Sequence, residues 1–292
     1  MELDMGYTCL GEKPMKQMCT VGREVRISGI GIHTGKYVNV RLKPSSLGKI
    51  VFRRTDLDNL EIPLDWRNMR AKNSSSLVSQ VCQIQTLEHL LAVLHVFGID
   101  SLLVDMDGDE IPIGDGSAFL LAQAMHQAGL RSLPRKRKSI KIARPFTIRE
   151  KNASVSFFPD EEFRITYCIE FDHPAIMRQE KSFLVEKENF IKEIAPARTF
   201  GFLKDVSVLR QQGLTLGGSL ENALILDEKR VINGPLNFPD EFVRHKILDF
   251  IGDLSLAGRS LIGHFKAYKA GHTLHLKAVR FLLENPQFWN YV

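Results

Sequence analysis

F-V-R-H-K-I-L-D-F-I-G-D, residues 242–253, is the stretch with the clearest structural pattern in the chain. Its apolar residues recur at helical spacing, and together with the residue that follows they form one stripe of Val243, Ile247, Ile251 and Leu254. The pattern predicts a helix over Asp240–Leu256 that turns this stripe toward a hydrophobic core.

A second stripe of the same predicted helix is polar. His245, Asp249 and Asp253 follow one another at intervals of four residues, so their side chains stack about one turn apart. Two ligands four residues apart hold zinc in the H-E-x-x-H helix, and His nitrogen and Asp oxygen are both good zinc ligands. The alternative is an ordinary solvated polar face, and this segment alone leaves both interpretations open.

Outward from this helix, the C-terminal half combines strands and helices. An apolar strand is predicted near Leu261–Tyr268, and a last helix is predicted after His272. Before the long helix the pattern predicts strands over Ile140–Ile148, Ser154–Phe158 and Arg164–Phe171, then a mixed region over residues 183–226.

The N-terminal half has a similar order. Apolar residues alternate with polar ones around Val38, Val40 and Leu42, as in a half-buried strand. Further strands are predicted from Ile50 and over Leu102–Val104, and helical spacing predicts helices over Thr86–Phe97 and Ser117–Ala128.

The segment R-S-L-P-R-K-R-K-S, residues 131–139, separates the two halves by a proline and a basic run. We therefore predict an N-terminal extension over residues 1–19, a first domain over 20–131, a linker over 132–139 and a second domain over 140–292. The order of elements predicts the α+β class, with two similar domains that each layer helices on a β-sheet.

Composition narrows the class of protein. The 292 residues are 44% hydrophobic and 25% charged, which is typical of a globular chain. No apolar run is long enough to span a bilayer, and the first thirty residues lack the pattern of a secretory signal. Four widely spaced cysteines favour a reducing cytoplasm. The net charge of +5 permits an anionic partner without naming one.

Glu88 and His89 lie inside a strongly apolar helical segment, T-L-E-H-L-L-A-V. An acid and a histidine there need partners or a pocket, because burying either one unpaired is costly. The alternative is a capped helix start, in which Thr86 lies near the N-cap and Glu88 is favourable in the first turn.

Taken together, the two segments supply three metal ligands, His89, His245 and Asp249. Three protein ligands leave a fourth position for water, which is typical of a catalytic zinc site. Glu88 adjoins one ligand and could accept the proton of that water.

Three other motifs favour structure over chemistry. Gly29–Gly35 has glycines at the wrong spacing for a dinucleotide fingerprint and leads into a strand. Gly217-Gly218-Ser219 lacks the G-x-S-x-G spacing of a serine hydrolase. Glu110–Ser117 is typical of a turn that ends at a helix cap.

The chain resembles a known enzyme family from about Thr20 to Val292. The markers, in chain order, are S-G-I-G-I-H-T-G-K, F-R-R-T-D, T-L-E-H-L-L-A, D-E-I-P-I-G-D-G-S-A, F-D-H-P-A-I, A-R-T-F-G-F, L-G-G-S, E-F-V-R-H-K-I-L-D-x-I-G-D-L and A-Y-K-A-G-H. These segments are similar to those of the bacterial UDP-3-O-acyl-N-acetylglucosamine deacetylases of lipid A biosynthesis. The resemblance implies a cytoplasmic zinc amidase with two α+β domains and an active site between them.

The resemblance also implies roles for individual residues. His89, His245 and Asp249 would be the zinc ligands, and Glu88 would be the general base. His272 would be the second catalytic group, as a cation or as the acid for the leaving amine.

Around this centre the resemblance implies supporting residues. Asp253 would orient His272, Thr199 would stabilise the oxyanion, and Lys246 would meet a substrate phosphate or developing charge. Phe200 would line the site, and Lys269 matches a basic position on the nucleotide side.

An inserted β-α-β element of the family, which forms a hydrophobic passage for the acyl chain, would span residues 202–226 here. The positions expected to line it are Leu203, Val206, Gly218, Ala223 and Ile225. A first-domain insert is expected near residues 62–79, where the N-S-S-S run starting at Asn73 matches no pattern of the family.

The implied partner is a UDP-sugar lipid precursor, and a monomer is expected. Peripheral contact with a membrane surface and the choice between zinc and iron stay open, because the same ligands suit both metals. One competing interpretation is a zinc deacetylase of another N-acyl sugar. The other is a protein that binds nucleic acid through its basic linker, although no aromatic residues are interleaved with that run.

Overall fold

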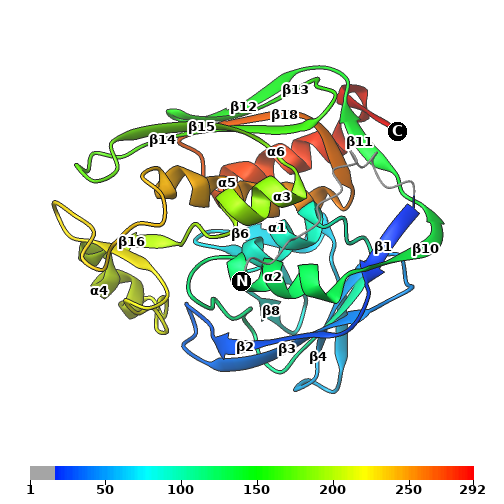
Figure 1. Cartoon of the computed structure of the whole chain (residues 1–292), viewed down its shortest axis with the longest axis horizontal. Coiled ribbons are helices and arrows are strands. Elements are labelled where there is room, and N and C mark those ends of the chain that lie inside the picture. Colours follow the sequence, from blue (N-terminus) through cyan, green and yellow to red (C-terminus); the bar gives the residue numbers. More distant parts are fainter. Residues whose placement is uncertain (1–16) are drawn as a thin grey trace, which may run out of the picture.

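In the computed structural model, which describes residues 17–292, two β-sheets enclose a double layer of helices (Figure 1). Residues 1–16 of the predicted N-terminal extension lie outside the described residues. Helices α5 and α6 lie under one sheet and α1 and α2 over the other, so the helical layers meet in the middle. The α+β class and the paired helix-on-sheet layers are confirmed.

The sheet of the N-terminal half has the strand order β2-β3-β9-β4-β5. Its strands are β2 (Val25–Ile30), β3 (Tyr37–Pro44), β9 (Leu102–Met106), β4 (Ile50–Arg54) and β5 (Leu60–Pro63). β3 alternates buried and exposed side chains, as its sequence predicts. The helices of this half are α1 (Glu88–Val96) and α2 (Phe119–Ala128).

The sheet of the C-terminal half has the order β12-β13-β18-β11-β19, and β14 pairs with both β18 and β15. Its strands are β11 (Ser139–Ile142), β12 (Phe146–Glu150), β13 (Ala153–Phe158), β14 (Phe163–Glu170), β15 (Arg178–Leu184), β18 (Ser260–Tyr268) and β19 (Trp289–Tyr291). Its long helices are α5 (Glu241–Leu254) and α6 (His272–Glu284), and the short α3 (Lys187–Asn189) precedes a π-helical turn.

Three small sheets complete the fold. β1 (Gln17–Val21) pairs with β10 (Leu130–Lys136), and β6 (Met69–Ala71) and β7 (Ser75–Val78) form a meander with β8 (Gln83–Ile84). β16 (Phe200–Phe202) and β17 (Leu224–Leu226) are parallel and enclose α4 (Leu203–Gln211). This β-α-β unit projects from the side of the molecule (Figure 1).

The two halves meet most closely where α1 packs on α5. Gly252 makes this approach feasible, because a Cβ added there would lie only 2.1 Å from the backbone oxygen of Glu88. Gly252 therefore lets the start of α1, with Glu88 and His89, pack against the C-terminal half of α5.

The sequence predicts one strand over Ile140–Ile148, but the structure has two, β11 and β12. Pro145 interrupts the ladder since it has no N–H to donate. The N–H groups of Ala143 and Arg144 turn to the carbonyl oxygen of Phe288 instead, at 2.8 and 3.2 Å.

The predicted linker is also more ordered than its sequence suggests, because most of it belongs to strand β10. Two of its four basic side chains form a hydrogen bond or an ion pair with other parts of the protein. Arg135 donates to the carbonyl oxygen of Leu47, and Nε of Arg137 lies 3.1 Å from Oδ1 of Asp100. Arg135, Lys136 and Lys138 nevertheless remain exposed, and the division into two domains at this segment stays a prediction.

His95, in the last turn of α1, packs edge-on against Phe163 of the other half, with ring centroids 5.1 Å apart. Burial, assisted by the positive charge of Arg137, lowers the pKa of His95 from 6.5 to about 3. The unfolded chain thus takes up a proton near pH 6.5 that the folded protein does not take up until about pH 3. The contribution of neutral His95 to the free energy of unfolding is therefore fully present above about pH 6.5. It is lost as the pH decreases, by about 2 kcal/mol at roughly pH 5.

We expect His95→Gln to remove most of this contribution. Urea unfolding at about pH 7.5 and about pH 5 should show a smaller loss of stability between the two values in the variant than in the wild type. His126→Gln, at an exposed position of α2, is the matched control and should unfold like the wild type. Equal losses in wild type and His95→Gln would contradict the assignment.

None of the helices formed by residues 17–292 has the length and apolarity that a membrane span requires.

Candidate metal centre and active site

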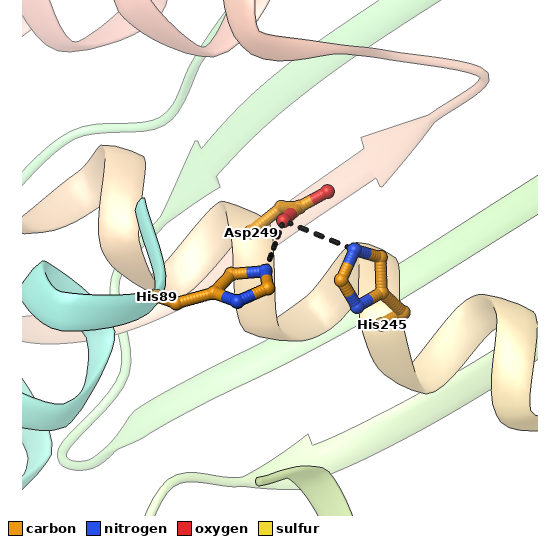
Figure 2. Close-up of side chains that lie close together, drawn as sticks. All are labelled: His89, His245 and Asp249. Atoms are coloured by element: carbon orange, nitrogen blue, oxygen red, sulfur yellow. Dashed lines mark ion pairs between the residues drawn. The ribbon is translucent and has the colours of Figure 1, made fainter. Parts of the chain in front are cut away.

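Three side chains converge where α1 crosses α5 (Figure 2). His89 is the second residue of α1, and His245 and Asp249 lie one turn apart on α5. Oδ1 of Asp249 is 3.6 Å from Nε2 of His89 and 3.5 Å from Nε2 of His245. All three are buried, so the alternative of a solvated polar face is wrong.

The ring of His245 has a defined tautomer. Burial lowers its pKa to about 3, so the imidazole is neutral and carries a single proton. Nδ1 lies 3.1 Å from the carbonyl oxygen of Ala197, which can only accept, so the proton is on Nδ1. Nε2 therefore presents a lone pair to the Asp249 carboxylate.

Two electron-rich atoms that face each other at this distance repel, and a cation between them removes the repulsion. The donor set of two imidazole nitrogens and one carboxylate oxygen, all within 4.8 Å of one another, fits a metal ion. It suits zinc or iron, and three ligands leave a coordination position for a further group. The structure thus brings together the three predicted ligands and gives them a geometry that can hold a metal.

Glu88 is the first residue of α1 and lies beside this group. Its Oε2 accepts a hydrogen bond from the backbone N–H of Ser75 at 3.0 Å, and its Oε1 lies 3.9 Å from Nε2 of His272. Burial raises the pKa of Glu88, partly offset by the charge of His272. A buried carboxylate with a raised pKa is a suitable general base.

Thr86 does not cap this helix. The N-cap is Leu87, without a side-chain cap bond, and the hydroxyl of Thr86 donates instead to Oε1 of Glu110 at 2.7 Å. Thr86 also has a backbone φ of +59°, a strained conformation for a β-branched residue. Glu110 accepts further bonds from the N–H groups of His33 and Thr34, so it holds the start of α1 and a neighbouring loop together.

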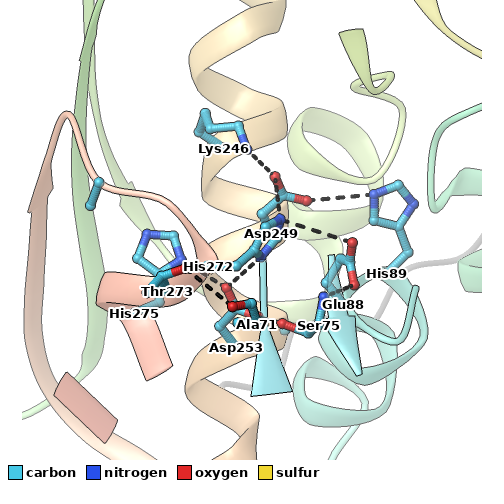
Figure 3. A network of polar contacts seen from close by, with 12 residues as sticks. Ala71, Ser75, Glu88, His89, Lys246, Asp249, Asp253, His272, Thr273 and His275 are labelled. Atoms are coloured by element: carbon cyan, nitrogen blue, oxygen red, sulfur yellow. Dashed lines mark hydrogen bonds and ion pairs between the residues drawn. The ribbon is translucent and has the colours of Figure 1, made fainter. Parts of the chain in front are cut away.

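His272 begins α6 and faces Glu88 (Figure 3). Its Nδ1 lies 2.8 Å from Oδ2 of Asp253, as predicted for an orienting carboxylate. Burial alone would lower the pKa of His272, but the charge of Asp253 and its hydrogen bond raise it to about 9. His272 is therefore cationic at neutral pH and can donate a proton.

Lys246 extends from α5 to the same place, and its Nζ contacts Oδ2 of Asp249. This contact leaves Oδ1 of Asp249 facing the two histidines. The ammonium group is thus held beside the three candidate ligands, on the wall of a cavity.

A cavity of about 570 Å³ opens from this centre. Its wall includes Glu88, the three candidate ligands, His272 and Lys246, together with Thr199 and Phe200 from the A-R-T-F-G-F segment. Thr199 is fixed through its backbone, since its N–H donates to Gly116 and its carbonyl oxygen accepts from Leu224, both at 2.8 Å.

The cavity continues along the projecting β-α-β unit, where its wall is mainly apolar. The five positions predicted to line the passage all contribute to it, namely Leu203, Val206, Gly218, Ala223 and Ile225. The unit also contacts the other half of the chain. A Cβ at Gly217 would lie 2.3 Å from the backbone oxygen of Gly31, so a glycine is needed for this approach.

Lys269 is not among the residues that line the described cavity. Its Nζ lies 3.6 Å from Oε2 of Glu170, which also accepts from the hydroxyl of Tyr268 at 2.8 Å. Lys269 has a φ of +50°, so its backbone is in the left-handed region. Its nucleotide-side role stays a prediction.

Among the residues of the cavity wall for which the sequence predicts no role are His33, Asn73 and Phe171. His33 lies in the glycine motif that was discounted as a phosphate loop, and its Nδ1 is buried without a hydrogen-bond partner among the described residues. Phe171 begins the F-D-H-P-A-I marker and packs edge-on against Phe200, with ring centroids 5.9 Å apart. Asn73 lies in the N-S-S-S run of the expected first-domain insert.

Comparison with known proteins identifies the family to which the chain belongs. The family profile for UDP-3-O-acyl N-acetylglycosamine deacetylase matches residues 18–284. A protein from Thermodesulfovibrio yellowstonii named UDP-3-O-acyl-N-acetylglucosamine deacetylase is 44% identical over 269 residues, covering 91% of each chain. Proteins of the same name from a Geobacter species and from Saccharophagus degradans are 42% and 40% identical, each over 94% of this chain and over 91% and 92% of their own length. The chain therefore belongs to the UDP-3-O-acyl N-acetylglycosamine deacetylase family.

Proposed function

We propose that the protein is a zinc-dependent deacetylase that removes acetate from UDP-3-O-(3-hydroxyacyl)-N-acetylglucosamine in lipid A biosynthesis. One observation carries the proposal. Three buried ligands from two halves of the chain meet beside a buried carboxylate, at the end of a cavity that continues into an apolar passage. The names of the relatives supply the substrate.

The proposed reaction is hydrolysis of an amide. Bound zinc would supply Lewis acidity toward the acetyl carbonyl and the attacking water. Glu88 takes a proton from that water while the oxygen of the water bonds to the carbonyl carbon. The C–N bond then breaks, the amine leaves with a proton from His272, and acetate remains.

Three further side chains assist the reaction, by stabilising developing charge or by orienting His272. Thr199 lies on the cavity wall, where it can donate to the oxyanion, an effect typically worth about 3 kcal/mol for one well-placed donor. Asp253 keeps the ring of His272 in place through Nδ1, so Nε2 points toward Glu88 and the reacting atoms. Lys246 provides a positive charge at the edge of the centre.

The principal test measures acetate and free amine released by the zinc-loaded protein. UDP-3-O-acyl-N-acetylglucosamine should be hydrolysed, and a chelator should stop the reaction until zinc is restored. Equal turnover of substrates without the UDP or the acyl chain would favour another N-acyl sugar. Salt-sensitive binding of DNA or RNA that a chelator leaves unchanged, without acetate release, would favour the nucleic-acid alternative.

The passage offers a matched pair of substitutions on α4. None of the residues of this helix is buried, and Val206 lines the cavity while Val208 is 53% exposed on the other side. We expect Val206→Trp to raise the KM for a long-chain substrate roughly tenfold, because it displaces contacts worth about two methylene groups. A substrate with an acetyl group in place of the long chain should be unaffected, and Val208→Trp should behave like the wild type with both.

Equal effects of Val206→Trp on long and short substrates would count against the passage as the acyl-chain site.

We further propose that the protein works in the cytoplasm as a monomer. The widely spaced cysteines support the reducing compartment. The completeness of the site within one chain supports the monomer, since α1, α5 and α6 supply every residue from Glu88 to His272 that the mechanism uses as ligand, base or acid. Peripheral contact with a membrane surface stays a prediction.

A further inference from the structure

The carboxylate of Asp253 accepts hydrogen bonds from three side chains, and only one of them belongs to the proposed mechanism (Figure 3). Oδ2 accepts from Nδ1 of His272 and from Nδ1 of His275, each at 2.8 Å. Oδ1 accepts from the hydroxyl of Ser75, on β7 of the other half. His275 therefore shares one oxygen atom with the proposed catalytic histidine.

His275 is completely buried, one turn after His272 on α6. Its ring packs on Phe250 with centroids 4.5 Å apart, and its Nε2 lies 3.0 Å from the hydroxyl of Tyr167. It is absent from the cavity wall that the described residues form, so it does not reach a bound substrate.

The protons of this cluster can be assigned from its donors and acceptors. Burial opposes ionisation of Asp253, but the two histidines stabilise its carboxylate and lower its pKa to about 2. The carboxylate therefore carries no proton. Both Nδ1 atoms must then be donors. Burial lowers the pKa of His275. The Tyr167 hydroxyl, 3.0 Å from Nε2 of His275, donates to the carbonyl oxygen of Ala270 at 2.7 Å.

The geometry gives this second histidine a function. Ser75 on β7 and His272 on α6 each hold one oxygen of the carboxylate, and His275 adds a second donor to Oδ2 from one turn further along α6. This second donor on Oδ2 limits rotation of the carboxylate about its side-chain bonds. Removing His275 would take one hydrogen bond from the buried Asp253 carboxylate, which costs free energy. The Asp253 side chain can recover part of this free energy by moving to another donor. Such a movement would displace the ring of His272.

We propose that His275 is a positioning residue, which fixes the Asp253 carboxylate and thereby holds His272 against Glu88. The inference rests on the proposed deacetylase function. It assigns to His275 no contact with the substrate or the metal.

The test compares two substitutions that both lose the contact with Tyr167. In His275→Asn the side-chain amide lies near the position of Nδ1 and can still donate to Asp253, whereas His275→Leu cannot donate. We expect kcat to fall about 10- to 100-fold in His275→Leu, with KM and bound metal unchanged. His275→Asn should stay within about threefold of the wild type.

Equal losses in the two variants, or a rise in KM that accounts for the effect of His275→Leu, would show a merely structural role and overturn the proposal. So would wild-type kcat in a folded His275→Leu protein. Thermal unfolding curves of both variants establish that they are folded.

A second measurement needs neither activity nor a folded Leu variant. In ¹⁵N-histidine-labelled wild-type protein, NMR should show His275 with its proton on Nδ1, assigned by the loss of that signal in His275→Asn. A proton on Nε2 instead would overturn the proposal, because Nδ1 could not then donate to the carboxylate. Absence of acetate release by the wild type would refute the proposed function alone and leave this result unaffected.

Discussion

Replacing Glu88 by Gln is expected to slow acetate release by about 10²- to 10⁴-fold while the protein keeps its metal. Gln preserves the size of the side chain and can still accept the hydrogen bond from the N–H of Ser75. It cannot take a proton from water, so only the base function is lost. Burial makes this function effective in the wild type, because it raises the pKa of the Glu88 carboxyl.

The measurement is kcat for acetate release together with metal content, in wild type and variant prepared in parallel. Glu61→Gln is a suitable control, because Glu61 lies on β5 with its side chain 53% exposed and is not among the residues that line the described cavity. A Glu88→Gln protein with bound metal and a kcat within tenfold of the wild type would refute the base assignment.

Replacing His245 by Ala should weaken metal binding by at least about 100-fold, and activity should fall with the metal. Removing a residue that only orients a ligand already costs about 10- to 100-fold in affinity, so loss of a ligand should cost no less. The remaining candidates, His89 and Asp249, come from different helices and would share the ion with water.

Elemental analysis after dialysis gives the metal content directly, and titration with zinc gives the change in affinity. His126→Ala removes an exposed histidine from α2 and should leave both values unchanged. If His245→Ala retained one tightly bound metal ion per chain, the ligand would have to be sought elsewhere. Together with Glu88→Gln, which is expected to keep its metal and lose turnover, this experiment separates binding from chemistry.

Most helices and strands could be predicted from the sequence because their patterns are local. The helix expected over Asp240–Leu256 is α5, and the strand expected near Leu261–Tyr268 is β18. The break at Pro145 and the pairing of β10 with β1 were missed. In both places the outcome depends on a distant partner, the carbonyl oxygen of Phe288 or the strand that begins at Gln17.

The residues of the candidate site, too, were only partly predictable from the sequence. A helix places residues four apart on one face, so the alignment of His245, Asp249 and Asp253 follows from their spacing. Ser75 and His275 lacked such a signal. Each becomes significant only because it meets the Asp253 carboxylate, and Ser75 is separated from that carboxylate by 178 positions in the chain.

The sequence by itself determined the α+β class, the reactive stripe of α5 and the family, because periodicity and motif order are properties of the chain alone. Only the tertiary structure decided which side chains share a centre. Contact between distant segments depends on how closely their backbones can pack, and here Gly252 lets α5 approach the start of α1. That approach brings His89 to Asp249 and Glu88 to His272, and burial in the same interface then sets the protonation state of each group.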